Sequence, residues 1–353
     1  GNGPTTIDIQ NCEFRNFTRG AIENRLDAGL SNSETRAIIS GCYFKNMGNS
    51  DGNGCSAIML GRNDAMLESI HITNCTFRNI EISGDVTNTD VHAVLCYGES
   101  VVVDGCHIEN ISNDYGDDAE AIYVKAAYSR IVNNYVRNGG TSHDGVITVK
   151  GTSIDGGYGF SDYCLIANNI IEFDDIDYDA PGIGVQRSHC LISNNILKDL
   201  RPTRTSLTYS MAMGIGTSSP VTHITVSDNI VDGFVNFMGN SSQEAFLTED
   251  IVIEGNNITN LAGGYGIYWR NDSRISNRAA TFAAADNSIT LDQTVPFPGT
   301  FDPSIYRAGV TIKVQSTVSN DGTYTVASWV DETKITVTSG ITNEYDAGCD
   351  IYR

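Results

Sequence analysis

The chain has 353 residues, 40% of them hydrophobic, which is enough to bury a long core in one large domain with room for a small second one. Its net charge of −21 and sequence pI near 4.5 argue against nucleic acid as a partner, because phosphates would be repelled. No apolar run approaches the roughly 18 residues of a membrane span, so we expect none. Because Gly1 falls in the middle of a strand pattern, we expect that further protein preceded it.

One short pattern occurs nine times along most of the chain, as in IHITNCTFRNI at 70–80. Each copy has an aliphatic residue three positions before an anchor, Asn, Gly or Asp immediately before it, and an apolar residue two positions after it. Asn, Gly and Asp are the residues that best tolerate the positive φ of a sharp turn. A repeat of about 26 to 35 residues with alternating apolar positions predicts a solenoid of short strands. The anchors are Cys12, Cys42, Cys75, Cys106, Asn134, Asn169, Asn195, Asn229 and Asn256.

A third strand follows each turn after a loop of variable length, for example AVLCY at 93–97, AIYVK at 121–125 and VITVK at 146–150. Three strands per rung, stacked in register, predict an all-β parallel β-helix of about nine to ten rungs. The anchors then form a ladder of four cysteines followed by five asparagines inside one turn.

The other five cysteines divide into two kinds. Cys96, Cys164 and Cys190 fall at inward positions of the repeat, where they act as small buried hydrophobic residues. Cys55 and Cys349 lie outside the pattern, and a disulfide between them stays open.

The repeat ends near residue 278, where the composition changes. Residues 279–353 contain short alternating strands separated by turns, including the hairpin signal NDG at 320–322. We therefore predict a β-helix at 1–278 and a small β-strand module at 279–353.

The repeated ladder turn resembles the pectate-lyase-like superfamily, which includes polysaccharide lyases, glycoside hydrolases and phage tailspike depolymerases. The resemblance implies a right-handed helix, an extracellular or virion-surface location, and the binding and degradation of a polysaccharide. It also implies a homo-oligomer, either a trimer or a fibre. The superfamily's site lies on the outer face of the strand before the ladder turn, beside loops of variable length.

Alternation along the strands at 93–97, 121–125 and 146–150 assigns their outward residues. We predict one outward column across neighbouring rungs, formed by Tyr97, Lys125, Lys150 and Gln186. We predict a second column beside it, formed by His92, Glu120 and Asp144, with Tyr123 and His143 on the same surface. The candidate substrate-binding residues are His92, Tyr97, Tyr123, His143 and Gln186.

Two directly stacked lysines are unusual in a chain with 22 basic and 43 acidic residues. Like charges so placed repel each other, and a lysine that gives up its proton can abstract the proton α to a uronate carboxylate. The stretch EAIYVKAAYSRIVNN at 120–134 resembles a rung of the alginate lyase and chondroitinase B family. That resemblance implies Lys125 or Lys150 as the base, and Arg187 is the nearest candidate for the acid. It also implies calcium, for which Asp117, Asp118 and Glu120 are the candidate ligands.

Two other functions stay open. A glycoside hydrolase would use carboxylates on the same surface, with Glu120 and Asp144 as the candidates. A structural fibre or adhesin would have no active site, and its lysines would only pair with neighbouring acids.

Overall fold

The computed structural model describes residues 5–24, 33–48, 54–61, 66–82, 90–113, 118–141, 145–150, 163–202, 210–215, 221–239, 248–262, 266–268, 275–291, 308–309, 311–315, 317, 319–331 and 334–352. Within these ranges the chain forms strands β1 to β31 and no helix, and therefore no helix that would cross a membrane. The chain divides into two compact units, with the main division between residues 269 and 270.

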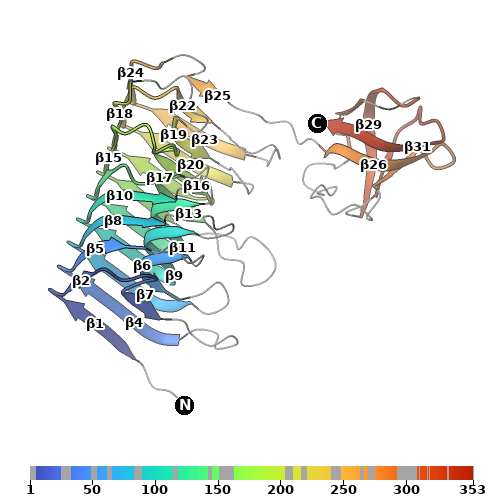
Figure 1. Ribbon diagram of the computed structural model, residues 1–353. Helices are drawn as coiled ribbons and strands as arrows, with labels where there is room; N and C mark the ends of the chain where they lie inside the picture. Colours follow the sequence, from blue (N-terminus) through green and yellow to red (C-terminus); the bar gives the residue numbers. More distant parts are fainter. Residues whose placement is uncertain are drawn as a thin grey trace. The chain divides into compact units, whose positions relative to one another are not determined.

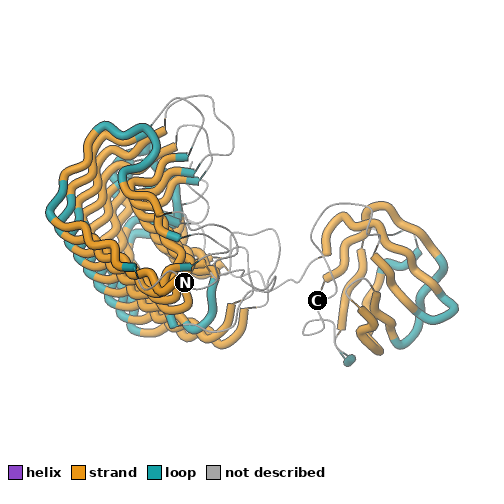
Figure 2. Tube along the Cα trace, turned by 90° about the horizontal axis from the view of Figure 1, so that it is seen from below, coloured by secondary structure: helices purple, strands orange, loops and turns teal. Residues whose placement is uncertain are grey.

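The first unit is a parallel β-helix (Figures 1 and 2), built from a nine-stranded sheet and a 16-stranded sheet that is described below as two sheets, the first and the third, which the long strands β9 and β11 connect. The first sheet precedes the ladder turn and comprises β1 (Thr6–Gln10), β4 (Ser33–Ser40), β7 (Leu67–Thr73), the second parts of β9 (Val91–Asp104) and β11 (Ala119–Val132), β14 (Cys164–Ala167), β17 (Cys190–Ser193), β20 (Val221–Ser227) and β23 (Thr248–Glu254).

The second sheet follows the ladder turn, and its nine strands confirm the nine copies of the repeat. They are β2 (Glu13–Arg15), β5 (Tyr43–Met47), β8 (Thr76–Ile82), β10 (His107–Asn113), β12 (Tyr135–Arg137), β15 (Ile170–Phe173), β18 (Ile196–Asp199), β21 (Ile230–Asp232) and β24 (Asn257–Thr259). The third sheet comprises β3 (Ile22–Asn24), β6 (Cys55–Leu60), the first parts of β9 and β11, β13 (Ile147–Lys150), β16 (Ile183–Gln186), β19 (Met211–Ile215), β22 (Asn236–Gly239) and β25 (Ile267–Tyr268).

Equivalent residues of neighbouring rungs lie directly above one another. The aliphatic residue three positions before the anchor pairs with its counterpart in the next rung, for example Ile9 with Ile39 and Ile39 with Ile72. Inside the second sheet, the ring of Phe44 stacks on those of Phe14 and Phe77 at centroid distances of 5.0 and 4.7 Å. The core is therefore a set of columns of like side chains that exclude water along the whole helix.

The predicted turn conformation is present at every anchor. The residue before each anchor has a φ between 52° at Asn11 and 68° at Gly105. Five of these nine residues are Asn, three are Gly (Gly41, Gly105 and Gly255) and one is Asp228, with a φ of 57°. These small residues let the chain turn without the steric cost that other side chains would carry.

The asparagine ladder is a continuous chain of buried hydrogen bonds. Asn195 Oδ1 accepts hydrogen bonds from the backbone nitrogen and the Nδ2 of Asn169, at 3.0 and 2.9 Å. Asn195 Nδ2 donates to Ile166 O at 2.9 Å and to Asn229 Oδ1 at 3.0 Å. Each amide therefore satisfies backbone groups of the turn that water does not reach.

The cysteines are mostly buried thiols. Cys96, Cys164 and Cys190 lie in the core, as predicted. Cys55 is also a free, fully buried thiol, and the side chain of Cys349, the partner that the sequence left open, lies outside the described residues.

The second unit is a closed antiparallel barrel, with strand order β26-β27-β30-β29-β28-β31. Its strands are β26 (Ile275–Ala283), β27 (Ser288–Leu291), β28 (Thr311–Gln315), β29 (Gly322–Asp331), β30 (Lys334–Val337) and β31 (Glu344–Tyr352). Phe282, Val314 and Ile335 belong to its own hydrophobic core. We expected the β-helix to continue to residue 278, whereas β26 begins at Ile275 and pairs with β31.

The ladder predicts a specific cost for losing one amide. Asn195→Ala removes the partners of the buried Asn169 N–H and Ile166 C=O, so the free energy of unfolding should fall by about 2–4 kcal/mol. The neighbouring Asn194→Gly is the control, because Asn194 is exposed at φ 57° and should change stability by less than about 0.5 kcal/mol. Urea denaturation followed by circular dichroism measures both. Equal stabilities of the two variants would contradict a structural role for the ladder.

Candidate functional site

The predicted lysine column is present, but it lies on the outer side of the third sheet and not on the strands directly before the ladder turn, where the resemblance placed the site. In the strand register Lys125 pairs with Tyr97 on one side and with Lys150 on the other, and Lys150 pairs with Gln186. Alternation accounts for this, because Val124 and Val149 beside the lysines are fully buried in the core. The lysines and Tyr97 are half-buried.

Aromatic rings hold both ammonium groups. Lys125 Nζ lies 5.5 Å from the ring centroids of both Tyr97 and Tyr123, and Lys150 Nζ lies 5.2 Å from that of Tyr123. Such contacts stabilise a cation by about 0.5–2 kcal/mol, depending on how far it is withdrawn from water. The Tyr123 ring therefore joins two positive charges on neighbouring rungs. We expected Tyr123 to be an exposed aromatic, but it is only 9% exposed.

The second column differs from its prediction in exposure. Glu120 pairs with His92 in the register, as predicted, and His92 Nε2 lies 3.1 Å from Glu120 Oε2. The expectation that both face solvent was wrong, because Glu120 is 0% and His92 3% exposed. His92 Nδ1 also lies 3.2 Å from Ser56 Oγ on the preceding rung.

The physical reason is a corner in the third-sheet strands. At this corner two consecutive residues enter the core, Ala93 with Val94 and Ala121 with Ile122. Simple alternation fails there, and the ring of Tyr123 after the corner packs against that of His92 before it, with the centroids 5.4 Å apart.

Burial sets the protonation of this region. It lowers the pKa of His92 to about 4, and the charges of Asp90 and Asp118 act in the opposite direction. Burial, with the charge of Asp90, raises the pKa of Tyr97 to about 12. At neutral pH the imidazole is therefore neutral and the phenol keeps its proton.

The remaining candidates are less exposed than the sequence suggested. Gln186 completes the lysine column but is only 3% exposed. Arg187 is 5% exposed and lies near the thiols of Cys164 and Cys190. Burial raises the pKa of Cys190, whereas the Arg187 charge lowers it. Arg187 therefore lies at the corner after β16 and not in the lysine column.

Part of the predicted site lies outside the described residues, namely Asp117, His143 and Asp144. Of the three predicted calcium ligands, Asp118 is half-buried and Glu120 faces His92. The part of the chain that the structure describes contains no group of three or more His, Cys, Asp or Glu residues arranged to hold a metal ion. Calcium binding stays a prediction.

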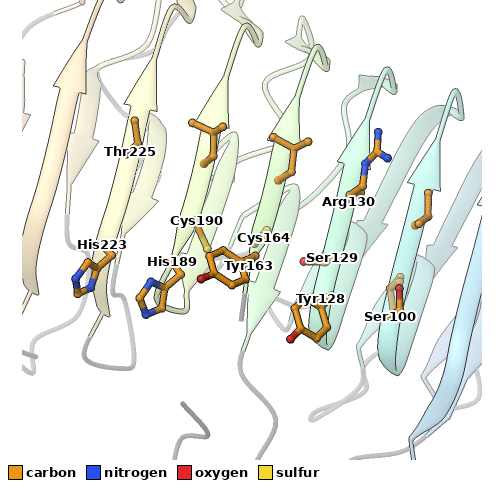
Figure 3. A pocket seen from close by; sticks show the side chains of 14 residues that line it. Ser100, Tyr128, Ser129, Arg130, Tyr163, Cys164, His189, Cys190, His223 and Thr225 are labelled. Atoms are coloured by element: carbon orange, nitrogen blue, oxygen red, sulfur yellow. The ribbon is translucent and has the colours of Figure 1, made fainter. Parts of the chain in front are cut away.

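A second surface was missed in the sequence. A groove of about 580 Å³ lies on the outer face of the first sheet, where rings from four neighbouring rungs form one row (Figure 3). The row is Tyr128, Tyr163, His189 and His223. Each of these residues lies six positions before an anchor of the repeat. Comparing the residues at this position across the copies would have revealed the row of rings in the sequence.

Comparisons with known proteins add a likeness of fold only. No protein-family model matches the chain, and no curated protein matches it significantly. A tailspike protein of E. coli bacteriophage HK620, solved as a mutant in complex with a pentasaccharide, is 12% identical with a TM-score of 0.31, over 97% of this chain and 69% of that one. The tailspike of Pseudomonas phage phi297 is 13% identical with a TM-score of 0.26, over 98% of this chain and 60% of that one. Similarity at this level supports no functional argument, and the narrower resemblance to pectate-lyase-like enzymes stays a prediction.

The buried imidazole predicts a pH-dependent loss of stability. The ordinary pKa of His92 is 6.5 and its folded value is about 4, so the unfolded chain binds the proton more tightly. The folded state is favoured above pH 6.5 and should lose roughly 2–3 kcal/mol of stability as the pH falls from 6.5 to 4. His92→Gln should remove this part of the pH dependence.

The exposed His71 offers the control, since His71→Gln should leave the pH dependence unchanged. The measurement is the difference in unfolding free energy between pH 7 and pH 4 for each variant. If His92→Gln shows the same difference as the parent protein, His92 is not buried in its neutral form.

Proposed function

We propose that the protein binds an acidic polysaccharide at the lysine column and cleaves it by β-elimination. The observation that carries the proposal is the in-register pair Lys125–Lys150, held around the Tyr123 ring in a chain of net charge −21. A local concentration of positive charge favours a negatively charged ligand. A polymer of uronate sugars is such a ligand, because each uronate unit carries a carboxylate.

The two lysines have different surroundings, and we assign them different roles. Lys125 contacts two rings, which favours its charged form, so its ammonium pairs with the substrate carboxylate. That charge makes the proton α to the carboxylate more acidic. Lys150 contacts one ring and is the proposed base.

Tyr97 completes the proposed reaction. Lys150 takes the α-proton, and the electron pair of that C–H bond forms a double bond to the adjacent ring carbon. The bond from that carbon to the glycosidic oxygen then breaks. Tyr97, protonated at neutral pH and adjacent to Lys125, donates a proton to the leaving oxygen. The products are an unsaturated uronide and a new reducing end.

The hydrolase alternative has less support. A glycosidase needs two carboxyl groups that reach the bond from opposite sides. Of the two carboxylates assigned to that role, Glu120 has no exposed surface and faces His92, and Asp144 lies outside the described residues. A fibre without catalytic activity would need no such arrangement of lysines and tyrosines.

Other expectations come from the superfamily resemblance alone. They are an extracellular or virion-surface location, a trimeric or fibrous assembly, and calcium at the site. We keep them as proposals.

The test is the rate of cleavage of uronate polysaccharides, followed by ultraviolet absorbance and reducing ends together. Lys150→Ala should lower kcat at least about 100-fold, the usual contribution of a general base, and Lys125→Ala should raise KM as well. Lys198→Ala is the control, because Lys198 pairs with Glu172 on the second sheet. Circular dichroism should show all three variants folded.

Each other outcome has a definite meaning. Reducing ends without absorbance would show hydrolysis and overturn the β-elimination. Parent rates in both Lys125→Ala and Lys150→Ala would overturn the assignment of the lysines. Absence of any cleavage across the uronate panel, with calcium present, would favour the fibre or adhesin.

A further inference from the structure

The groove on the first sheet is separate from the lysine column, which lies on the third sheet. Its walls come from β9, β11, β14, β17 and β20, so it runs across successive rungs, along the helix axis (Figure 3). Five rungs at the usual strand spacing of about 4.8 Å span roughly 19 Å, the length of a short oligosaccharide. The groove therefore fits an extended chain better than a compact small molecule.

One side of the groove is the row of rings. The centroids of Tyr128 and Tyr163 lie 6.5 Å apart, those of Tyr163 and His189 5.8 Å, and those of His189 and His223 4.6 Å. Tyr128 and Tyr163 are 55% and 68% exposed, which is unusual for neighbouring large aromatic residues on a monomer surface. Such rings offer an apolar surface with a polar edge, as a pyranose ring does.

The other side is a second row, parallel to the rings, in which Arg130 is followed on the next two rungs by leucines. Arg130 pairs in register with Leu165, Leu165 with Leu191, and Leu191 with Thr225. Arg130 is exposed, and Leu191 is 40% exposed. The rows combine apolar contact area with a few polar groups at the ends, the usual composition of a ligand site.

The charge of the groove distinguishes between possible occupants. Among the described residues that line it none is acidic and Arg130 carries a permanent positive charge, while His223 at one end lies 3.4 Å from Asp250 Oδ2 through its Nε2. The lining therefore has one Arg and no Asp or Glu among its described residues, in a chain with 22 Lys and Arg and 43 Asp and Glu. A carboxylate of an acidic sugar chain matches the exposed guanidinium of Arg130, and the sugar rings match the row of aromatic side chains beside it.

We propose that this groove is a second saccharide-binding site, which holds an acidic oligosaccharide along the helix axis without cleaving it. Sugar rings lie against Tyr128, Tyr163 and the two imidazoles, and a uronate carboxylate pairs with Arg130. The site holds the polymer independently of the lysine column. It does not depend on whether cleavage occurs there.

The experiment measures binding in a background that removes the lysine column, Lys125→Ala with Lys150→Ala. The probes are a galacturonate hexamer and the neutral maltohexaose, titrated by calorimetry. We expect the double variant to bind the galacturonate hexamer and to bind maltohexaose more weakly. Adding Tyr163→Ala or Arg130→Ala should weaken galacturonate binding at least fivefold.

The matched control is Tyr43→Ala, which removes a half-exposed tyrosine from the second sheet, where Arg15 lies over its ring at 5.7 Å. It should leave the affinity unchanged. The proposal is overturned if the double variant binds no galacturonate, or if Tyr163→Ala and Arg130→Ala leave its affinity unchanged. Concentration-dependent self-association that Tyr163→Ala abolishes would also overturn it, by showing that the groove is an interface between copies. A protein that binds here but never cleaves would overturn only the proposed function.

Discussion

The structure depends on the in-register stacking of one rung on the next. Parallel pairing satisfies the backbone of each strand from the strands on both sides, and it places equivalent side chains directly above one another. Ile over Ile and Phe over Phe fill the core, and Asn over Asn satisfies the buried turn. Any residue type repeated in the register becomes a column, whether it stabilises the helix or not.

The same constraint explains the two candidate sites. On the third sheet it stacks Lys125 on Lys150, a repulsive arrangement that the Tyr97 and Tyr123 rings offset. On the first sheet it aligns Tyr128, Tyr163 and two histidines on the outer face. Both sites are linear and run across rungs, so both suit a polymer whose units repeat along its length.

The two candidate sites differ in how far their side chains are withdrawn from water, although both arise from the stacking of rungs. The lysine column lies beside the buried pair His92–Glu120, so charge there is held in a partly water-excluded setting, where electrostatic effects are strong. The ring row is open to solvent, and its contribution comes from contact area. The first surface is suited to stabilising developing charge, and the second to holding a chain in place.

The sequence by itself determined the nine rungs, the positive-φ turns, the cysteine and asparagine ladder and the column Tyr97–Lys125–Lys150–Gln186. All of these follow from a local repeat, and each rung repeats the same backbone geometry.

Only the tertiary structure decided how far each outward residue is exposed. His92 and Glu120 are buried against each other, and the Tyr123 ring packs on His92, at a place where Ala93–Val94 and Ala121–Ile122 enter the core and the two-residue period of a strand no longer holds. Arg187 lies near the thiols of Cys164 and Cys190 for a related reason, since it follows the end of β16 and turns toward the next sheet. Exposure depends on how sheets meet at corners, and a one-dimensional repeat contains no information about that.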